Sequence, residues 1–302
     1  MVSGEPKKSC ELCVVSCEKD LDRPDKPSTR DPIPATPYTI RLEILKIKDA
    51  LKNALQREDE TLDELFGDRL KILQKKRGYR FSIDAILLAD FVKLKRGEKV
   101  IDLGAGSGVI AIVLALRFPR SGRIMGLELQ GQLVDMARRS VEVNGLGERI
   151  EILQGDVRAV GESLAAESFD VAVFNPPYRK AGSGRTNPEE EKALARHEVR
   201  GRAADFLSAS ARLLKDGGRV YLIYPAKRMV EIIHKMRVLS LEPKKLRIVY
   251  SGASSEGDFV LVEGLRGGGE ELKVLPPLYL YGEKGGYSGE LKGIFNALSA
   301  LS

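Results

Sequence analysis

The chain has 302 residues, 43% of them hydrophobic, with a formal net charge of +6 and a sequence pI of about 9.1. This length and apolar content suffice for one α/β domain with a full core and an extension. No apolar run approaches the roughly 20 residues of a membrane span, and no secretory signal segment opens the chain, so we expect a cytoplasmic protein that does not enter membranes.

The N-terminal residues differ in composition from the rest. Residues 1–39 are rich in Pro, Lys, Asp and Ser, which is typical of a flexible or extended tail. Residues 41–55 place apolar side chains at helical spacing, which predicts an amphipathic helix. We therefore expect an extension over residues 1–58 and a main domain over residues 59–302.

All three cysteines of the chain, Cys10, Cys13 and Cys17, lie in the tail. They supply three thiolates, whereas a tetrahedral structural zinc site needs four ligands. A redox-labile tail is therefore the simpler interpretation, and a zinc or iron–sulfur site would need a fourth ligand from elsewhere in the chain.

Two segments carry a local excess of positive charge. Residues 68–96 hold nine Lys or Arg against three Asp, and residues 215–250 hold nine against three acids. The first segment includes Lys75, Lys76 and Arg77, and its residues 69–80 are interpreted as a strand pair. Basic surfaces are usually just solvated, but two such segments also fit contacts with nucleic-acid phosphates.

A glycine-rich loop joins a short strand to an apolar helix. The strand is predicted over residues 100–103, glycines follow at alternate positions, and residues 109–116 predict a buried helix. Gly104, Gly106 and Gly108 let a ligand approach the backbone, and the helix start offers free N–H groups. The spacing differs from the G-x-G-x-x-G of dinucleotide sites, and Asp102 at the strand end indicates a cationic or hydroxyl-bearing ligand.

Two further predicted strands end in acids. Residues 123–128 end in Glu128, at the spacing expected of a carboxylate that binds a ribose diol. Residues 150–157 contain Asp156, which suits an adenine amino group. One acid of this kind is as often a helix N-cap or a solvated loop residue, but acids at three successive strand ends favour a single ligand site.

Asn175, Pro176, Pro177 and Tyr178 directly follow the apolar run 169–174. A planar NH2 group is a poor nucleophile because its lone pair is delocalised, so a catalyst needs acceptors that bind the amino hydrogens. The Asn175 side chain and the Pro176 carbonyl can accept them, and the two prolines hold these acceptors rigid. Tyr178 offers a flat face for a planar target.

The rest of the chain continues the alternation of strands and helices that is typical of a doubly wound α/β sheet. We expect a helix over residues 206–214, a strand over 217–224, and further strands near 246–249 and 259–262.

The chain resembles the class I S-adenosylmethionine-dependent methyltransferases, and within them the amino-group methyltransferases with an (Asn/Asp)-Pro-Pro-(Tyr/Phe) motif. Over about residues 60–295 it is similar to the bacterial tRNA adenine-N6 methyltransferase family, which acts on the adenosine beside the anticodon of a valine tRNA. The segments that carry this similarity are residues 61–65, 73–75, 78–89, 187–188, 195–198, 276–281 and 286–288.

This resemblance implies a seven-stranded Rossmann-like sheet with an antiparallel last strand, S-adenosylmethionine as cofactor and tRNA as partner. The cofactor's adenine and ribose would lie at Asp156 and Glu128, and its methionine end near Asp102 and the glycine loop. The target adenine would flip out onto Tyr178 with its amino group at Asn175 and the Pro176 carbonyl, and no metal is called for.

Each of three further residues has more than one interpretation. Asp84 is either a helix N-cap or, as the resemblance implies, part of the cofactor pocket. Arg196 and His197 order the loop after the motif, contact RNA, or simply begin a helix.

Other functions remain open at this point. A glutamine N5-methyltransferase of the release-factor type uses the same motif, but that family has a long helical domain before its core, and only residues 41–55 could begin one here. An rRNA or DNA amino-methyltransferase is also compatible. A non-catalytic RNA binder is disfavoured by the intact acids Asp102, Glu128 and Asp156.

Overall fold

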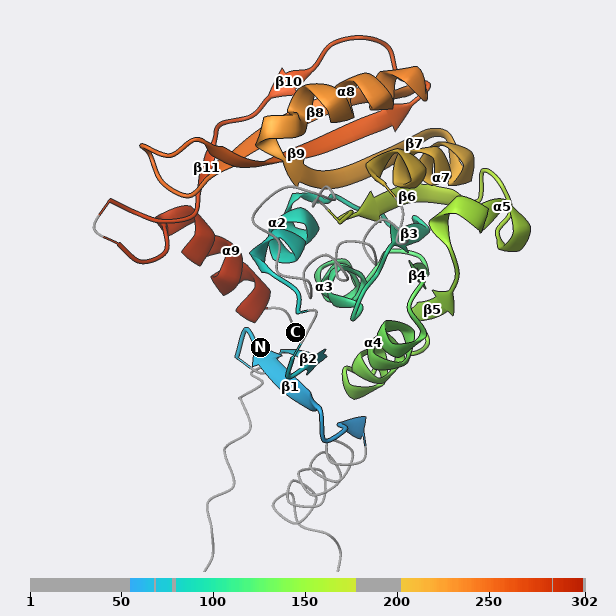
Figure 1. Cartoon of the computed structure of the whole chain (residues 1–302), viewed down its shortest axis with the longest axis vertical. Helices are drawn as coiled ribbons and strands as arrows, with labels where there is room; N and C mark the ends of the chain where they lie inside the picture. The colour runs from blue at the N-terminus through green and yellow to red at the C-terminus, as the bar shows by residue number, and fades with distance from the viewer. Residues whose placement is uncertain (1–54, 68, 78–79, 178–201, 284, 301–302) are drawn as a thin grey trace, which may run out of the picture. The chain divides into compact units, whose positions relative to one another are not determined.

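A computed structural model of the chain describes residues 55–67, 69–77, 80–177, 202–283 and 285–300 (Figure 1). All of them belong to one compact unit, Lys48–Ser302. The tail, its cysteines and nearly all of the predicted helix over 41–55 lie outside the described residues, so the division at residue 58 stays a prediction. Within the described part of the chain, no helix is long and apolar enough to cross a membrane.

A central nine-stranded sheet organises the unit, in the order β10-β8-β9-β7-β6-β3-β4-β5, with β11 also paired to β8. The strands β3 to β7 run parallel, and β9 lies antiparallel between β7 and β8. The strands are β3 Val100–Leu103, β4 Ile124–Glu128, β5 Ile150–Gln154, β6 Phe169–Phe174, β7 Leu214–Pro225, β8 Leu241–Tyr250, β9 Gly257–Arg266, β10 Lys273–Val274 and β11 Leu278–Tyr279. The doubly wound sheet with an antiparallel last strand is thus confirmed, and two short edge strands, β10 and β11, extend the predicted seven.

Helices cover both faces of the sheet (Figure 1). One face packs against α2 Ile83–Phe91, α3 Val109–Arg117, α4 Gly131–Val143 and α9 Gly289–Ser299. The other packs against α5 Val160–Ser163, α7 Ala203–Leu213 and α8 Met229–Val238. Because both faces are covered, successive residues of a central strand are both buried: Val100 contacts one core, and its neighbour Ile101 contacts the other.

A β-hairpin precedes the sheet. It consists of β1 Glu60–Leu65 and β2 Leu70–Lys75, so the strand pair expected over residues 69–80 was wrong in its bounds. The chain reverses at Phe66 and Gly67, both with positive φ. The partner of β2 is therefore the segment before this turn, β1, and not the residues that follow β2. An isolated two-stranded hairpin is only marginally stable in water. This one is anchored to α4 by the ion pair of the buried Glu60 with Arg139, and by the Leu73 N–H, which donates to the Ser140 hydroxyl.

Candidate active site

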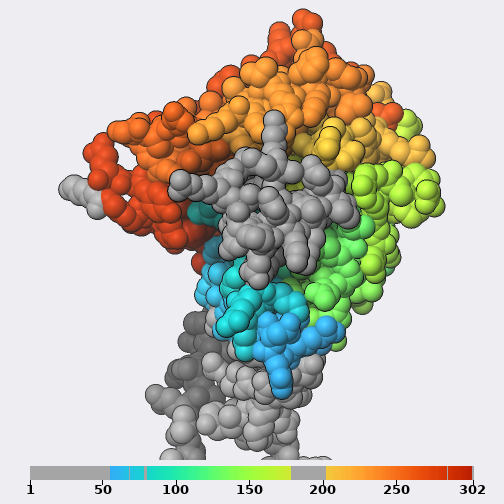
Figure 2. Space-filling view, viewed as in Figure 1, coloured from blue at the N-terminus to red at the C-terminus, as the bar shows by residue number. Residues whose placement is uncertain are grey.

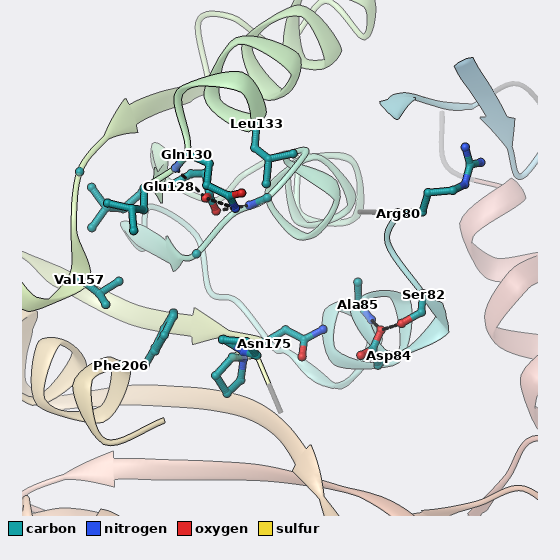
Figure 3. Close-up of a pocket in the computed structure, with 17 residues that line it drawn as sticks. Arg80, Ser82, Asp84, Ala85, Glu128, Gln130, Leu133, Val157, Asn175 and Phe206 are labelled. Atoms are coloured by element: carbon teal, nitrogen blue, oxygen red, sulfur yellow. Dashed lines mark hydrogen bonds between the residues drawn. The ribbon is translucent and has the colours of Figure 1, made fainter. Parts of the chain in front are cut away.

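A cavity of about 260 Å³ opens where β3, β4 and β6 end (Figure 3). Parallel strands present their carboxyl ends at one edge of the sheet, and open α/β sheets bind ligands there. Seven of the residues predicted for the site line this cavity: Asp84, Gly104, Gly106, Glu128, Asn175, Pro176 and Pro177.

Glu128 ends β4, and its buried carboxylate organises the cavity wall. One oxygen accepts the backbone N–H of Gly106 at 3.0 Å. The other accepts the backbone N–H of Gln130 at 2.9 Å and its side-chain amide at 3.2 Å. A carboxylate offers about four acceptor positions, and three of them are used, so this one can still accept a hydroxyl hydrogen from a ligand. Gln130, which the sequence reasoning missed, lines the cavity beside it (Figure 3).

The glycine loop approaches α7 so closely that Gly104 has no room for a side chain. Its φ is +73°, and a Cβ there would lie 2.9 Å from the ring of Phe206. Phe206 itself lines the cavity and packs against Phe174, with ring centroids 5.5 Å apart. No pattern in the sequence indicated Phe206, because its role depends on how α7 returns to the sheet. Gly108 does not line the cavity and instead caps α3 with a left-handed conformation.

Asp102 is fully buried in β3 and does not line the cavity. Among the residues that the structure describes, neither carboxylate oxygen makes a hydrogen bond of regular geometry, and the same holds for the hydroxyl of Ser107. Burial raises the pKa of Asp102 to about 7, with a smaller contribution from the charge of Glu128, although the backbone amide of Ala111 acts in the opposite direction. Asp102 is thus a buried acid whose ionised form is disfavoured, close in sequence to the cavity's glycine loop.

Asp156 lies beyond the end of β5, which stops at Gln154. It caps the short 3-10 helix η1 Val157–Ala159, accepts the backbone N–H of Arg158 at 2.9 Å and pairs with the Arg158 guanidinium. These bonds to Arg158 lower the pKa of Asp156. Its neighbours Gly155 and Val157 line the cavity but Asp156 does not, so its contact with an adenine stays a prediction.

Asp84 lies in the first turn of α2, whose N-cap is Ser82, so the interpretation of Asp84 as an N-cap was wrong. The carboxylate is buried and lines the cavity, where it accepts the Ser82 hydroxyl and the Ala85 N–H (Figure 3). Arg80, just before this turn, also lines the cavity and pairs with Asp63 of the β1–β2 hairpin at 2.5 Å. Ser82 and Arg80 were not singled out from the sequence.

Asn175 follows directly after the buried end of β6, at the strand next to the glycine loop. Its side chain projects into the cavity on the side facing Ala85 and Asp84 (Figure 3). Pro176 and Pro177 continue the wall. Tyr178, Arg196 and His197 lie outside the described residues, so their expected roles stay predictions.

The predicted RNA-binding cations lie on the β1–β2 hairpin and its exit. Lys75 is already paired with Asp59 at 2.6 Å, and the Lys76 ammonium donates to the Glu58 carbonyl at 2.6 Å. Arg77 is exposed. No group of His, Cys, Asp and Glu in the described ranges could hold a metal ion, and the three cysteines fall outside those ranges.

Comparison with known proteins gives concordant results. Residues 79–240 match the family model described as methyltransferase small domain. A tRNA1(Val) (adenine(37)-N6)-methyltransferase of Aeromonas hydrophila is 32% identical over 184 residues, which cover 61% of this chain and 75% of that protein. A protein of the same name from Tolumonas auensis is 27% identical, and the match spans 65% of its length and 53% of this chain.

One solved structure supports the fold. A predicted O-methyltransferase from Agrobacterium tumefaciens superposes with a TM-score of 0.58 at 23% identity, covering 71% of this chain and 96% of that one.

Proposed function

The chain belongs to the S-adenosylmethionine-dependent methyltransferases of the small-domain family and, within them, to the bacterial tRNA adenine-N6 methyltransferases, and from this premise we propose that it methylates the exocyclic N6 amino group of an adenine in tRNA. The names of the relatives point to adenine 37 of a valine tRNA as the target. Because tRNA is the proposed substrate, we also propose that the enzyme acts in the cytoplasm.

The observation that supports the proposal best is the position of Asn175 in the same cavity as Glu128 and the glycine loop. An acceptor for amino hydrogens and an acceptor for ribose hydroxyls thus share one space of about 260 Å³. The amide that would hold the target nitrogen therefore lies within the pocket that would hold the methyl donor.

The residues present fit S-adenosylmethionine. Glu128 can accept from the ribose diol, while Leu133 and Val157 offer apolar surface for the adenine. The acid Asp84, which lines the cavity, suits the cofactor's positively charged groups, and Asp102 lies buried directly before the glycine loop. When bound, the cofactor supplies an electrophilic methyl group on a sulfonium.

The remaining chemistry belongs to the chain's own residues. The Asn175 carbonyl and the Pro176 carbonyl accept the two amino hydrogens of the target adenine, which turns the nitrogen lone pair out of the ring plane. Since a stacked base cannot reach this cavity, the adenine must be flipped out, and Tyr178 stacks against its ring. The acceleration then comes mainly from alignment of the two reacting groups, and the amino proton leaves to water.

A glutamine methyltransferase of the release-factor type remains the alternative to be excluded. The described residues that precede α2 form the β1–β2 hairpin rather than a long helical domain, which favours the RNA substrate. The decisive experiment compares nucleosides of bulk tRNA from cells with and without the gene. Loss of N6-methyladenosine in the deleted strain supports the proposal, whereas unchanged tRNA together with loss of N5-methylglutamine in release factors would overturn it.

A further inference from the structure

Three tyrosines near the C-terminus leave much of their rings exposed. Tyr279, Tyr281 and Tyr287, together called the tyrosine surface below, are 37%, 47% and 46% exposed. The rings of Tyr281 and Tyr287 stack at 5.9 Å with an interplanar angle of 23°. Figure 2 shows the C-terminal residues, in red, at the left of the described surface.

Strand register places this surface at the same edge of the sheet as the candidate active site. Tyr279 pairs with Tyr250, the last residue of β8, in the parallel β11–β8 ladder. Tyr281 continues along it, since its N–H bonds the Ser251 carbonyl at 2.9 Å, and Tyr287 bridges Tyr281. β8 and β6 point the same way, because β9 is antiparallel to both β7 and β8 and β7 is parallel to β6. The tyrosines therefore lie beyond the carboxyl ends of the strands, as Asn175 does.

The separation along this edge suits a short stretch of RNA. Four steps between neighbouring strands, at about 4.8 Å each, lead from β6 to β11. Tyr250 also lies a few residues further along the strand direction than Asn175, so Tyr279 is on the order of 20 Å from Asn175. At a rise of roughly 3.4 Å per stacked nucleotide, this corresponds to about six nucleotides.

An exposed cation lies between the two places. Lys227 follows β7 in the short helix η2 Ala226–Arg228 and is 79% exposed. In the described structure its ion pair is with Glu256, at 3.4 Å, and Glu256 is 86% exposed. Such an exposed pair contributes little, so the Lys227 ammonium can exchange this carboxylate for a phosphate.

We propose that the tyrosine surface stacks unpaired bases of the RNA loop that presents its adenine to Asn175, with Lys227 contacting the intervening phosphates. This inference rests on the proposed function. Single-stranded nucleic acid is commonly held by aromatic faces together with cations that follow the backbone, and that combination is present along this edge. An anchoring site for loop bases about six nucleotides from the target would keep the loop in place while the adenine is flipped.

Ring packing and hydrogen bonds support the tyrosines from beneath. Tyr287 packs edge-on against Phe295 of α9, with ring centroids 5.4 Å apart. Its neighbour Ser288 caps α9 through the Leu291 N–H at 3.0 Å and bonds the Leu280 carbonyl at 2.9 Å. Rings fixed in this way lose little conformational entropy when a base stacks on them.

The test measures tRNA binding by fluorescence anisotropy at fixed salt. The double variant Tyr281→Leu/Tyr287→Leu keeps apolar bulk but removes the ring faces, and should weaken binding roughly ten- to a hundredfold, the range expected when stacking with one base is lost. The matched variant Tyr281→Phe/Tyr287→Phe, and Val230→Ala on the exposed face of α8, should bind within about twofold of the parent. Calorimetry should give an unchanged S-adenosylmethionine affinity for all three.

Salt dependence separates stacking from charge. The leucine variant should keep the parental slope of log Kd against log salt, whereas Lys227→Ala should lower that slope by about one. Parental tRNA affinity in the leucine variant would overturn the role of the tyrosines, and a parental slope in Lys227→Ala would overturn the role of the lysine.

A measurement on the unaltered protein covers the case in which the leucine variant does not fold. With 2-aminopurine at unpaired loop positions up to about six nucleotides from the target adenine, saturating parent protein should change its fluorescence through stacking, and the phenylalanine variant should reproduce that change. No change at any of these positions overturns the inference. Methyl transfer to tRNA by the same preparation is measured in parallel, so that transfer without a fluorescence change removes only the tyrosine surface, while absence of transfer removes the proposed function itself.

Discussion

The buried carboxylate of Glu128 accepts a hydrogen bond from the backbone N–H of Gly106 at 3.0 Å. The bond ties the end of β4 to the glycine loop that follows β3, two segments that neighbour one another only because the strands pair in parallel. The same side chain thus shapes the loop and faces the cavity, so a change at Glu128 affects both.

Replacing Glu128 by Ala should weaken S-adenosylmethionine binding roughly ten- to a hundredfold, because a charge-assisted acceptor worth about 1.5–3 kcal/mol is lost. Glu128→Gln should also weaken binding, since its NH2 group would face one of the two backbone N–H donors now bound by the carboxylate. Isothermal calorimetry measures both, with Glu162→Ala on α5 as a distant control. Parental affinity in both variants would place the cofactor elsewhere.

Gly104→Ala should destabilise the protein by about 1–3 kcal/mol, because the left-handed backbone disfavours a side chain and the new Cβ would meet the ring of Phe206. Phe206→Leu replaces that ring with a smaller aliphatic side chain but leaves the backbone strain at Gly104→Ala in place. The double variant should therefore be more stable than the sum of the two single effects predicts. Urea denaturation of the four proteins measures this coupling, and strict additivity would contradict the close contact.

Much of this site was predictable because it depends on local sequence. The strand ends, the glycine loop and the Asn-Pro-Pro motif are continuous segments, and the parallel order of strands then brings Gly104, Glu128 and Asn175 to one cavity. The role of Asp156 was harder to predict. Arg158, two residues on, binds its carboxylate, and such a local pair depends on the turn geometry of η1 rather than on strand periodicity.

The residues that were missed depend on contacts between distant segments. Phe206 reaches the cavity only through the packing of α7 against the glycine loop, and Arg80 only through the turn that leads from the hairpin into α2. The bounds of the hairpin were wrong for a similar reason. Glu60 is buried by its pairing with Arg139 of α4, and a charged residue gives no sign in the sequence of being a buried strand residue.

Asp102 should make stability depend on pH. Its pKa is about 7 in the folded protein and near 3.8 ordinarily, so between these values the folded state binds more protons than the unfolded state. The contribution of this carboxyl is therefore most favourable below about pH 4 and is lost as the pH rises through 7, with a total of about 4 kcal/mol.

Asp102→Asn removes this titration. Urea denaturation between pH 5 and pH 8, without ligand, should show the free energy of unfolding falling less steeply with pH in the variant than in the parent. Equal slopes in the two proteins would mean that Asp102 is ionised throughout this range.

The hairpin cations should differ in their effect on tRNA binding. Changing Lys75, Lys76 and Arg77 together to Ala should weaken tRNA binding and flatten its salt dependence, while cofactor binding stays unchanged. Because Lys75 is paired with Asp59, we expect most of this effect from Lys76→Ala/Arg77→Ala and little from Lys75→Ala alone. Binding titrations at several salt concentrations measure the slopes. A triple variant with the parental slope would move the RNA contact away from the hairpin.

Asn175→Ala should remove most of the catalytic rate while leaving binding nearly intact. The Asn175 carbonyl would act on the amino group mainly in the transition state, when the nitrogen lone pair turns out of the ring plane, and an interaction made chiefly there appears in kcat rather than in ground-state affinity. The variant should keep its fold, bind S-adenosylmethionine and tRNA nearly as the parent does, and lose about a hundredfold or more in turnover.

Tyr178→Ala should instead lower both base capture and rate, because stacking of about 1–3 kcal/mol helps to hold the flipped base. Single-turnover transfer of labelled methyl to tRNA at saturating enzyme separates the two effects, since saturation hides a binding defect but not a chemical one. If Asn175→Ala methylates tRNA at the parental rate under these conditions, the amino group is not held by this side chain, and the proposed chemistry is wrong even with an intact cofactor site.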